Sequence, residues 1–410
     1  MKKIWFVSHY SMPPKYEMRI KTQMYAHYLK QMGYETKIFS ASTIHNTDIN
    51  LINDNKEYIC CKYDDLDFVH IKCNNYTGNG IKRIKNMLEF SIKFKTVARN
   101  FSLPDVIVAD VNCINYEPIY NFCKQNKIKF FIDMRDLWPM SIVEYYGYSE
   151  RNPIIKYLYN REKNMYKRAD GIIFSMEGGR EYIKDKGWGK YIEERKIHYI
   201  NNGVNLGEFY REVQNFRISD QELDDMDTFK VIYTGSVRVA NDLKTVVDAA
   251  KIIKNNGYNN IKILIYGDGP DKNTLSDYCK ENNIDNIHFK GFVEKKYVPY
   301  LLSKSDISLL NYKNAKTLRY GGSQNKLFEY MAAGKPVLVT VDMNYSPVVK
   351  YNCGISLKQA SPESIANAII HLYQLPHEER YKMGENAKDC VKEYDFKKLT
   401  ERLEGVIFSK

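Results

Sequence analysis

A short stretch near the end of the chain, GGSQNKLFEYMAAGKP at residues 321–336, gathers side chains that could act on a charged ligand. Lys326 and Glu329 are three residues apart, so a helix would place them side by side, just after Ser323, which can cap its start. Gly334 would end this helix. On these residues alone, the charged pair is either the solvated face of a surface helix, worth about 0.2–0.5 kcal/mol, or part of a binding site. The inward stripe of the helix would consist of Leu327, Phe328, Met331 and Ala332.

The composition is that of an ordinary globular protein with a basic balance. The chain has 410 residues, 44% of them hydrophobic and 27% charged, which suits two domains. Its formal charge of +11 favours anionic partners, but no nucleic-acid-binding module accompanies the basic residues, so we expect no nucleic acid partner. The first apolar run, KIWFVSHY, is too short for a signal peptide, and no stretch is long enough to span a bilayer. We therefore expect a cytoplasmic protein, either free or peripheral at the inner face of the plasma membrane.

Patterns that would indicate a metal or a dinucleotide cofactor are incomplete. The eight cysteines include no CxxC pair and the eight histidines show no HxH or HExxH spacing, so we expect no metal and no cofactor. The DLD at residues 65–67 lies in a polar, irregular segment and is a weak candidate for a metal-binding pair of carboxylates. Gly267 and Gly269 begin a GxGxxG pattern after a strand, but its third glycine position holds Lys272, which disfavours a nicotinamide enzyme.

Strands and helices alternate along both halves of the chain. KIWFVSHY, a helical stretch ending on Gly33, and YETKIFSAS form a first β-α-β unit, and the same alternation restarts at FKVIYTGS. We predict an α/β protein with one doubly wound domain over 1–205 and a second over 206–375. The helical tail, 376–410, has no strand partner and would pack back on the first domain.

Seven motifs occur in an order that resembles the family-4 glycosyltransferases of the GT-B fold, over nearly the whole chain. The resemblance is strongest to the branch that builds bacterial capsules and O-antigens, including N-acetylfucosamine-type transferases. It implies two Rossmann-like domains facing a deep cleft, with the acceptor bound by the first domain and the nucleotide-sugar by the second. The motifs are RDLWP (135–139), YKRADGIIFSMEGG (166–179), KIHYINNGVNLGEFY (196–210), VIYTGS (231–236), YGDGP (266–270), HFKGF (288–292) and NKLFEYMAAGKPVL (325–338).

The resemblance assigns the donor site to the helix described first. It implies that Glu329 accepts hydrogen bonds from the two ribose hydroxyls, a role suited to an acceptor-only carboxylate. Lys326 would place a positive charge near the diphosphate. The backbone at Phe292 and Val293 would bind the nucleobase and favour uracil, or these residues are a plain strand end. Peptide N–H groups at the helix start would face the diphosphate, at Ser323, Gln324 and Asn325.

The chain departs from the family pattern at three positions around this site. An arginine usually follows Gly235 and a lysine comes five residues further on, but the chain has Ser236 and Asn241 there. Arg238 either substitutes for that arginine, in the loop with Gly235 and Ser236, or is a solvated loop residue. The first of the family's two glutamates is replaced by Gly321.

The first domain carries the acceptor side by the same resemblance. Arg135 and Asp136 stand where many relatives have a His-Asp pair, and they complete the expected catalytic set with Arg238 and Lys326. Arg135 either contacts the donor or forms a buried ion pair with Asp133 or Asp136. The first loop would bind the acceptor through Pro14 and Arg19.

A basic stretch at residues 80–101, GIKRIKNMLEFSIKFKTVARNF, interleaves lysines and arginines with apolar residues. Such a helix can lie on an anionic membrane surface, or it has a core-facing stripe and a solvated basic face. The resemblance favours a membrane because the branch glycosylates lipid-linked saccharides.

Three functions remain open on the sequence alone. The first is a retaining glycosyltransferase that moves a sugar from a nucleoside diphosphate, expected to be UDP, to a lipid-linked saccharide in capsule, O-antigen or other surface polysaccharide biosynthesis. The second is a nucleotide-sugar epimerase on the same fold. The third is a non-catalytic nucleotide-binding or membrane-binding partner in an assembly complex, which the three departures would favour.

Overall fold

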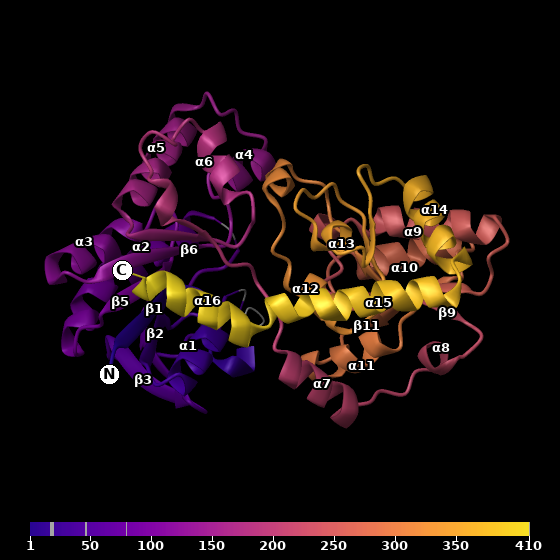
Figure 1. The fold of residues 1–410 in the computed structure, drawn as a ribbon, viewed down its shortest axis with the longest axis horizontal. Coiled ribbons are helices and arrows are strands. Elements are labelled where there is room, and N and C mark those ends of the chain that lie inside the picture. The colour runs from indigo at the N-terminus through magenta and orange to yellow at the C-terminus, as the bar shows by residue number, and fades with distance from the viewer. Residues whose placement is uncertain (17–19, 46, 79, 410) are drawn as a thin grey trace. The chain divides into compact units, whose positions relative to one another are not determined.

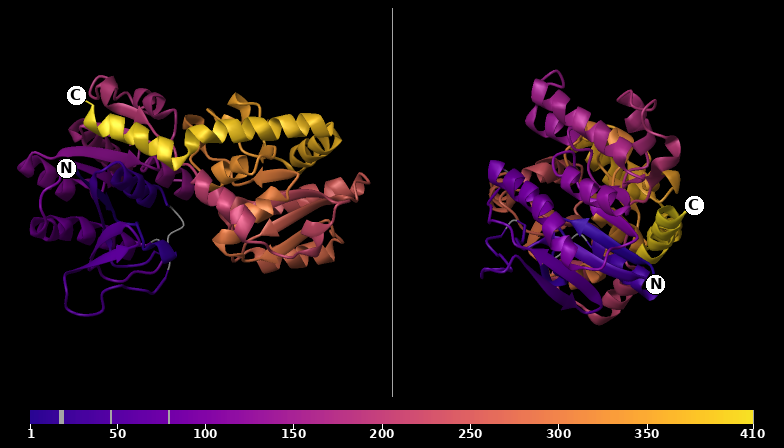
Figure 2. Two further views of the ribbon diagram at one scale, coloured as in Figure 1. Left: turned by 60° about the horizontal axis from the view of Figure 1, so that its bottom comes forward. Right: turned by 90° about the vertical axis from the view of Figure 1, so that its left-hand side faces the viewer.

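The computed structural model describes residues 1–16, 20–45, 47–78 and 80–409 (Figure 1). The chain forms two compact units, one made of 1–201 with 396–410 and the other of 202–395. Each unit has a sheet with helices on both faces, which confirms the predicted doubly wound α/β class (Figure 2). Among the described residues, no helix has the length and apolar character needed to cross a membrane.

The sheet of the first unit has the order β3-β4-β2-β1-β5-β6-β7-β8, and every neighbouring pair is parallel except β3 with β4. The chain order reverses between β1 and β5, which places the ligand crevice of such a sheet beyond the carboxyl ends of these two strands. The DLD motif lies where β4 begins, and its Asp65 and Asp67 pair with His27 and Lys30. The strands are β1 (Lys3–Ser8), β2 (Glu35–Ala41), β3 (Tyr58–Tyr63), β4 (Leu66–Ile71), β5 (Val106–Asp110), β6 (Lys129–Met134), β7 (Gly171–Phe174) and β8 (Ile197–Tyr199).

Helices cover both faces of this sheet because side chains alternate along its strands. Ile4 and Phe6 face a core shared with α1 and α16. Trp5 points to the other face, where its ring meets Phe94 of α2 and Phe122 of α3. The α-helices of this unit are α1 (Lys21–Gln31), α2 (Ile81–Val97), α3 (Tyr116–Asn126), α4 (Met140–Tyr146), α5 (Pro153–Arg168), α6 (Gly179–Asp185) and α16 (Phe396–Phe408).

The second unit has a fully parallel sheet with the order β11-β10-β9-β12-β13-β14. The helices α9 and α14 pack on one face, and α11, α12 and α15 belong to the core of the other. Its strands are β9 (Phe229–Thr234), β10 (Ile261–Tyr266), β11 (Ile287–Gly291), β12 (Ile307–Leu310), β13 (Val337–Val339) and β14 (Gly354–Ser356). Its α-helices are α7 (Leu206–Asn215), α8 (Gln221–Asp224), α9 (Leu243–Asn255), α10 (Lys272–Glu281), α11 (Val298–Ser303), α12 (Asn325–Ala332), α13 (Pro347–Lys350), α14 (Pro362–Gln374) and α15 (His377–Val391).

The chain returns to the first unit later than residue 376, the boundary that the sequence suggested. Helix α15 stays in the second unit, where Ala387, Cys390 and Val391 are buried in its core. A Cβ at Gly384 would lie 2.1 Å from the carbonyl oxygen of Gly334, so this glycine lets α15 approach the end of α12. Only α16 packs on the first unit, which begins again at residue 396.

A buried carboxyl group in the first unit makes its stability depend on pH. Glu162 of α5 accepts hydrogen bonds from the hydroxyls of Tyr166 and Tyr182, both at 2.7 Å. Burial raises the pKa of Glu162 to about 7, and the two hydrogen bonds oppose this shift. The unfolded chain therefore loses this proton from about pH 4.5 upward, whereas the folded chain holds it until about pH 7. The free energy of unfolding therefore decreases as the pH rises from about 4.5 to about 7, and this group lowers it no further above pH 7.

Replacing Glu162 by glutamine removes this titration and keeps a similar shape. We expect the difference in the free energy of unfolding between Glu162→Gln and the wild type to change by about 2 kcal/mol in favour of the variant from pH 5 to pH 8. The reason is that only the wild type must bury a charge at the higher pH. Urea unfolding at both pH values measures the difference. An equal difference in stability between the two proteins at both pH values would contradict the prediction.

Candidate functional site

Helix α12 is fixed to the carboxyl end of β9 by one buried tyrosine. The backbone N–H of Thr234 donates to the Tyr330 hydroxyl at 3.0 Å. That hydroxyl in turn donates to the carbonyl oxygen of Thr234 at 3.2 Å. The helix begins after Gln324, whose side chain makes no capping hydrogen bond, so the expected cap by Ser323 is wrong. The Ser323 carbonyl instead accepts from Asn202 Nδ2 at 2.6 Å, which ties the loop before α12 to the start of the unit.

Gly235, the residue after β9, makes room for the Lys326 ammonium. A Cβ on Gly235 would lie 2.6 Å from Lys326 Nζ, and its φ of +139° is one that other residues rarely adopt. Lys326 Nζ donates to the Tyr233 hydroxyl at 3.2 Å and lies 4.3 Å from the centre of that ring. Burial, opposed by the charge of Glu329 and aided by that of Arg238, lowers the pKa of Lys326 to about 8.

A buried cation, Lys326, and an exposed one, Arg238, therefore act on each other at the carboxyl edge of the sheet. Like charges repel, so an arrangement that holds Arg238 near Lys326 is stabilised by a bound anion. Arg238 itself is exposed. Asn241 holds the preceding loop by donating from Nδ2 to the Ser236 carbonyl at 2.6 Å, so the residue at the family's lysine position has a structural contact here.

The glycines of the GDGP motif let the loop after β10 approach the loop after β9. A Cβ on Gly267 would lie 1.7 Å from the Gly235 carbonyl oxygen, and one on Gly269 would lie 2.1 Å from that of Val237. The Val237 N–H donates to the Asp268 carbonyl at 2.9 Å. The two loops after β9 and β10 therefore support each other's backbone.

Glu329 lies beside Lys326 on α12 and forms an ion pair with Lys295. Its side chain is only 15% exposed, whereas that of Lys295 is 49% exposed and extends from the segment after β11. The half-buried Glu212 of α7 is close enough to Glu329 and Lys295 for their charges to affect its pKa. Burial, together with the negative charges of Glu208 and Glu329, raises the pKa of Glu212 to about 7, and the positive charge of Lys295 opposes this shift. The sequence did not reveal Lys295 or Glu212, because neither belongs to a motif.

The two residues expected at the nucleobase differ in exposure. Phe292 is 72% exposed and directly follows Gly291, the last residue of β11, whose φ is +82°. Val293 is partly buried against the core that contains α12. Phe292 therefore offers an open aromatic face, and Val293 anchors the segment that carries Lys295.

In the first unit, Arg135 lies in an ion-paired cluster at the carboxyl edge of the sheet. Its Nε lies 3.2 Å from Asp133 Oδ2 and 3.4 Å from Asp110 Oδ2, and its Nη2 donates to Thr22 Oγ1 at 2.6 Å. The pairing with Asp133 is one of the two alternatives that the sequence left open. Asp136 is exposed.

A buried lysine that the sequence did not reveal completes this cluster. Lys21 Nζ lies 2.8 Å from Asp133 Oδ1 and donates to Ser175 Oγ at 2.8 Å and to the Ile200 carbonyl at 3.1 Å. Asp133 thus bridges two cations. Pro14 lies in a short 3-10 turn after β1, and Arg19 lies outside the described residues.

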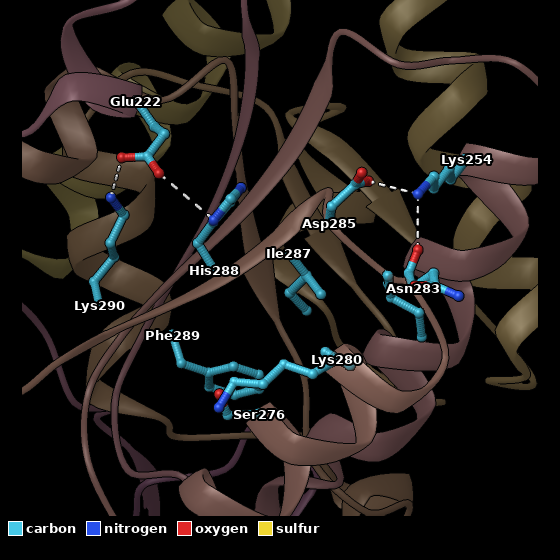
Figure 3. A pocket seen from close by; sticks show the side chains of 12 residues that line it. Glu222, Lys254, Ser276, Lys280, Asn283, Asp285, Ile287, His288, Phe289 and Lys290 are labelled. Atoms are coloured by element: carbon cyan, nitrogen blue, oxygen red, sulfur yellow. Dashed lines mark hydrogen bonds and ion pairs between the residues drawn. The ribbon is translucent and has the colours of Figure 1, made fainter.

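A separate polar hollow of about 690 Å³ lies along β11 in the second unit (Figure 3). Glu222 pairs there with Lys290 and with His288, and Lys254 pairs with Asp285 at 2.9 Å and donates to the Asn283 carbonyl. These lysines are already neutralised, and none of the expected donor-binding residues lines the hollow. The candidate site is therefore the carboxyl edge near α12.

Comparison with solved structures shows that the chain has the GT-B fold. Sucrose-phosphate synthase (tll1590) from Thermosynechococcus elongatus aligns over 98% of both chains with a TM-score of 0.73 and 16% identity. Alr3699/HepE from Anabaena, solved with UDP and glucose, aligns over 100% of both chains with a TM-score of 0.68 and 12% identity. WaaG, a glycosyltransferase involved in lipopolysaccharide biosynthesis, aligns over 99% of this chain and 100% of its own, with a TM-score of 0.66 and 13% identity.

The sequence comparison adds a match for most of the second unit. Residues 214–389 match the family described as glycosyl transferases group 1. No curated protein sequence matches the chain. The matched residues include Gly235, Lys326 and Glu329, so the region of similarity contains the candidate site.

Proposed function

We propose that the protein is a retaining glycosyltransferase that takes a sugar from a nucleoside diphosphate and transfers it to a lipid-linked saccharide. The observation that carries this proposal is the arrangement on α12, where the Lys326 ammonium lies against Gly235, in the electrostatic field of Arg238 and of Glu329 on the same helix. The match of this region to the group 1 glycosyl transferases supports it. UDP is the proposed leaving group, supported by the GT-B neighbour solved with UDP and glucose.

The proposed reaction breaks the bond between the anomeric carbon and the diphosphate, so negative charge develops on the leaving phosphate. Lys326 and Arg238 would stabilise that charge without moving, which is the most effective way for fixed charges to lower a barrier. The backbone of Gly235 and Ser236 and the N–H groups at the start of α12 would add donors to the same oxygens. This reaction needs no metal ion.

The remaining donor contacts follow from the same placement. Glu329 would accept hydrogen bonds from the ribose hydroxyls, which requires Lys295 to share or leave its ion pair. The exposed ring of Phe292 would lie against the base, with the backbone of Val293 beside it. Arg135 and Asp136 of the first unit would complete the catalytic set. Pro14 and Arg19 would bind the acceptor, in the synthesis of a surface polysaccharide such as a capsule or O-antigen.

Nucleotide binding tests the role of Glu329. Titration calorimetry of the wild type with UDP, GDP and phosphate is expected to show binding of one nucleoside diphosphate, and Glu329→Ala is expected to weaken it about 10- to 100-fold. A hydrogen bond to a charged group contributes about 1.5–3 kcal/mol, which sets this range. The outcome also identifies the donor class for activity screening.

Glu294→Ala is the matched control, because this exposed carboxylate lies in the segment of Lys295 but pairs with Lys296. If Glu329 serves only its ion pair, its removal frees the Lys295 ammonium and UDP binds as tightly or more tightly. That outcome would reject the ribose role. Tight binding without turnover of any donor would instead favour a non-catalytic partner in an assembly complex.

A further inference from the structure

Strand β3 is the end strand of the sheet in the first unit (Figure 1). The outer side of an end strand carries backbone N–H and C=O groups that can pair with another strand. Proteins usually prevent such pairing with a proline, a bulge or several charged side chains. β3 has six residues, Tyr58–Tyr63, without a proline, its register with β4 has no bulge, and Lys62 is its one charged residue. The outer side of β3 is therefore poorly protected against pairing.

The pairing of β3 with β4 shows which backbone groups point outward. The Lys72 N–H donates to the Glu57 carbonyl at 2.8 Å, so these two residues form a hydrogen-bonded pair of the antiparallel ladder. Such pairs alternate along the strands, so the odd-numbered residues of β3 bond to β4. The N–H and C=O groups of Tyr58, Cys60 and Lys62 therefore point away from β4. In the parts of the chain that the structure describes, these groups have no backbone partner, and Cys60 and Lys62 are exposed.

We propose that β3 pairs antiparallel with β3 of a second copy of this chain, about a two-fold axis at Cys60. Because the outward groups belong to even-numbered residues, Cys60 can form hydrogen-bonded pairs only with an even-numbered residue of the other strand. With Cys60 opposite Cys60, Tyr58 lies opposite Lys62 on both sides of the axis, and the strands form about six backbone hydrogen bonds. On the other face of the sheet, Ile59 lies opposite Cys61, which is an apolar cross-strand pair.

The charges around β3 select this register and favour a second copy as the partner. In the proposed register, Lys56 lies opposite Asp64 at both ends of the pair, and no like charges meet between residues 56 and 64. A shift by two residues in one direction would place Lys56 opposite Lys62, and the same shift in the other direction would place Glu57 opposite Asp65. Directly opposed like charges destabilise a strand pair. A segment that is complementary to itself in a single register suits a two-fold symmetric dimer.

Sedimentation velocity of the full chain tests the association. One strand pair buries less surface than a standard protein interface, so we expect a reversible dimer with a dissociation constant of about 10–100 µM. Runs below and above this range are expected to show a monomer that converts to a dimer. The association needs no nucleotide and no turnover, so it can fail or succeed independently of the proposed reaction.

Cys60→Pro tests the backbone hydrogen bonds at the axis. Proline removes the outward N–H but leaves the ladder with β4 intact, because an edge strand accepts proline where its N–H points outward. We expect this variant to weaken dimerisation about 5- to 150-fold, from the loss of two hydrogen bonds. Cys60→Ser is the matched control, since it loses the same thiol but keeps the N–H, and it is expected to dimerise as the wild type does. Equal dimerisation of the two variants would overturn the proposal.

Two measurements on the wild type test the register without a proline. A short bismaleimide is expected to join two chains through Cys60, because opposed residues of a hydrogen-bonded pair have Cα atoms about 5.5 Å apart. This product is expected to be absent from Cys60→Ser and present in Cys61→Ser. Hydrogen exchange of the peptide that contains β3 is expected to be slower in the dimer than in the monomer, because the outward N–H groups become bonded. A monomer at every concentration would overturn the proposal, and so would a dimer that lacks either the crosslink or the slower exchange.

Discussion

Replacing Lys21 by methionine is expected to destabilise the first unit by about 3–5 kcal/mol, the usual cost of removing one partner from a buried ion pair. The side chains of Lys21 and Asp133 are only 3% and 4% exposed. The methionine fills a similar volume but leaves the Asp133 carboxylate with Arg135 as its remaining cation. The Ser175 hydroxyl and the Ile200 carbonyl also lose their donor. Urea unfolding of both proteins measures the loss.

Lys30→Met is the matched control for this experiment. Lys30 belongs to the same helix, α1, and pairs with Asp67 at 2.7 Å, but its side chain is 32% exposed. An exposed pair contributes about 0–1 kcal/mol, so this variant is expected to lose little. A loss below about 1 kcal/mol in Lys21→Met would show that water reaches the cluster and that the two pairs are equivalent.

Replacing Lys326 by methionine is expected to lower turnover of the donor sugar by about 100- to 1000-fold, because one fixed charge or donor at a developing anion contributes on this scale. The donor would be the nucleotide-sugar that carries the nucleoside diphosphate bound in calorimetry. In the wild type, kcat/KM for this donor is expected to fall above about pH 8, where free Lys326 loses its proton. The methionine variant is expected to lack this step in its pH profile.

Two further variants test whether the position of the Lys326 ammonium matters and whether the loss of any exposed lysine would have the same effect. Gly235→Ala keeps the lysine but places a methyl group where its ammonium lies, so it is expected to lower turnover in the same direction. Lys313→Met removes an exposed lysine from the loop after β12 and is expected to leave turnover unchanged. Normal turnover in Lys326→Met would show that Arg238 and backbone donors suffice for the leaving group.

The sequence by itself determined the doubly wound class, because a strand that alternates with an amphipathic helix can bury its apolar residues in few other ways. The sequence also predicted which face of α12 carries the charges, and that this helix ends at Gly334. Both features depend only on residues within one or two helical turns of each other. The pairing of Arg135 with Asp133 was already one of two alternatives, because the two residues are close in the chain.

Only the tertiary structure decided which distant residues meet these groups. Lys295 reaches Glu329 across 34 positions, and Lys21 reaches Asp133 across 112. A lysine in an amphipathic helix such as α1 is usually solvated, and only the strands around it make Lys21 a buried cation. The point at which the chain returns to the first unit likewise depends on which core α15 fits, a property of packed shapes that helical periodicity does not contain.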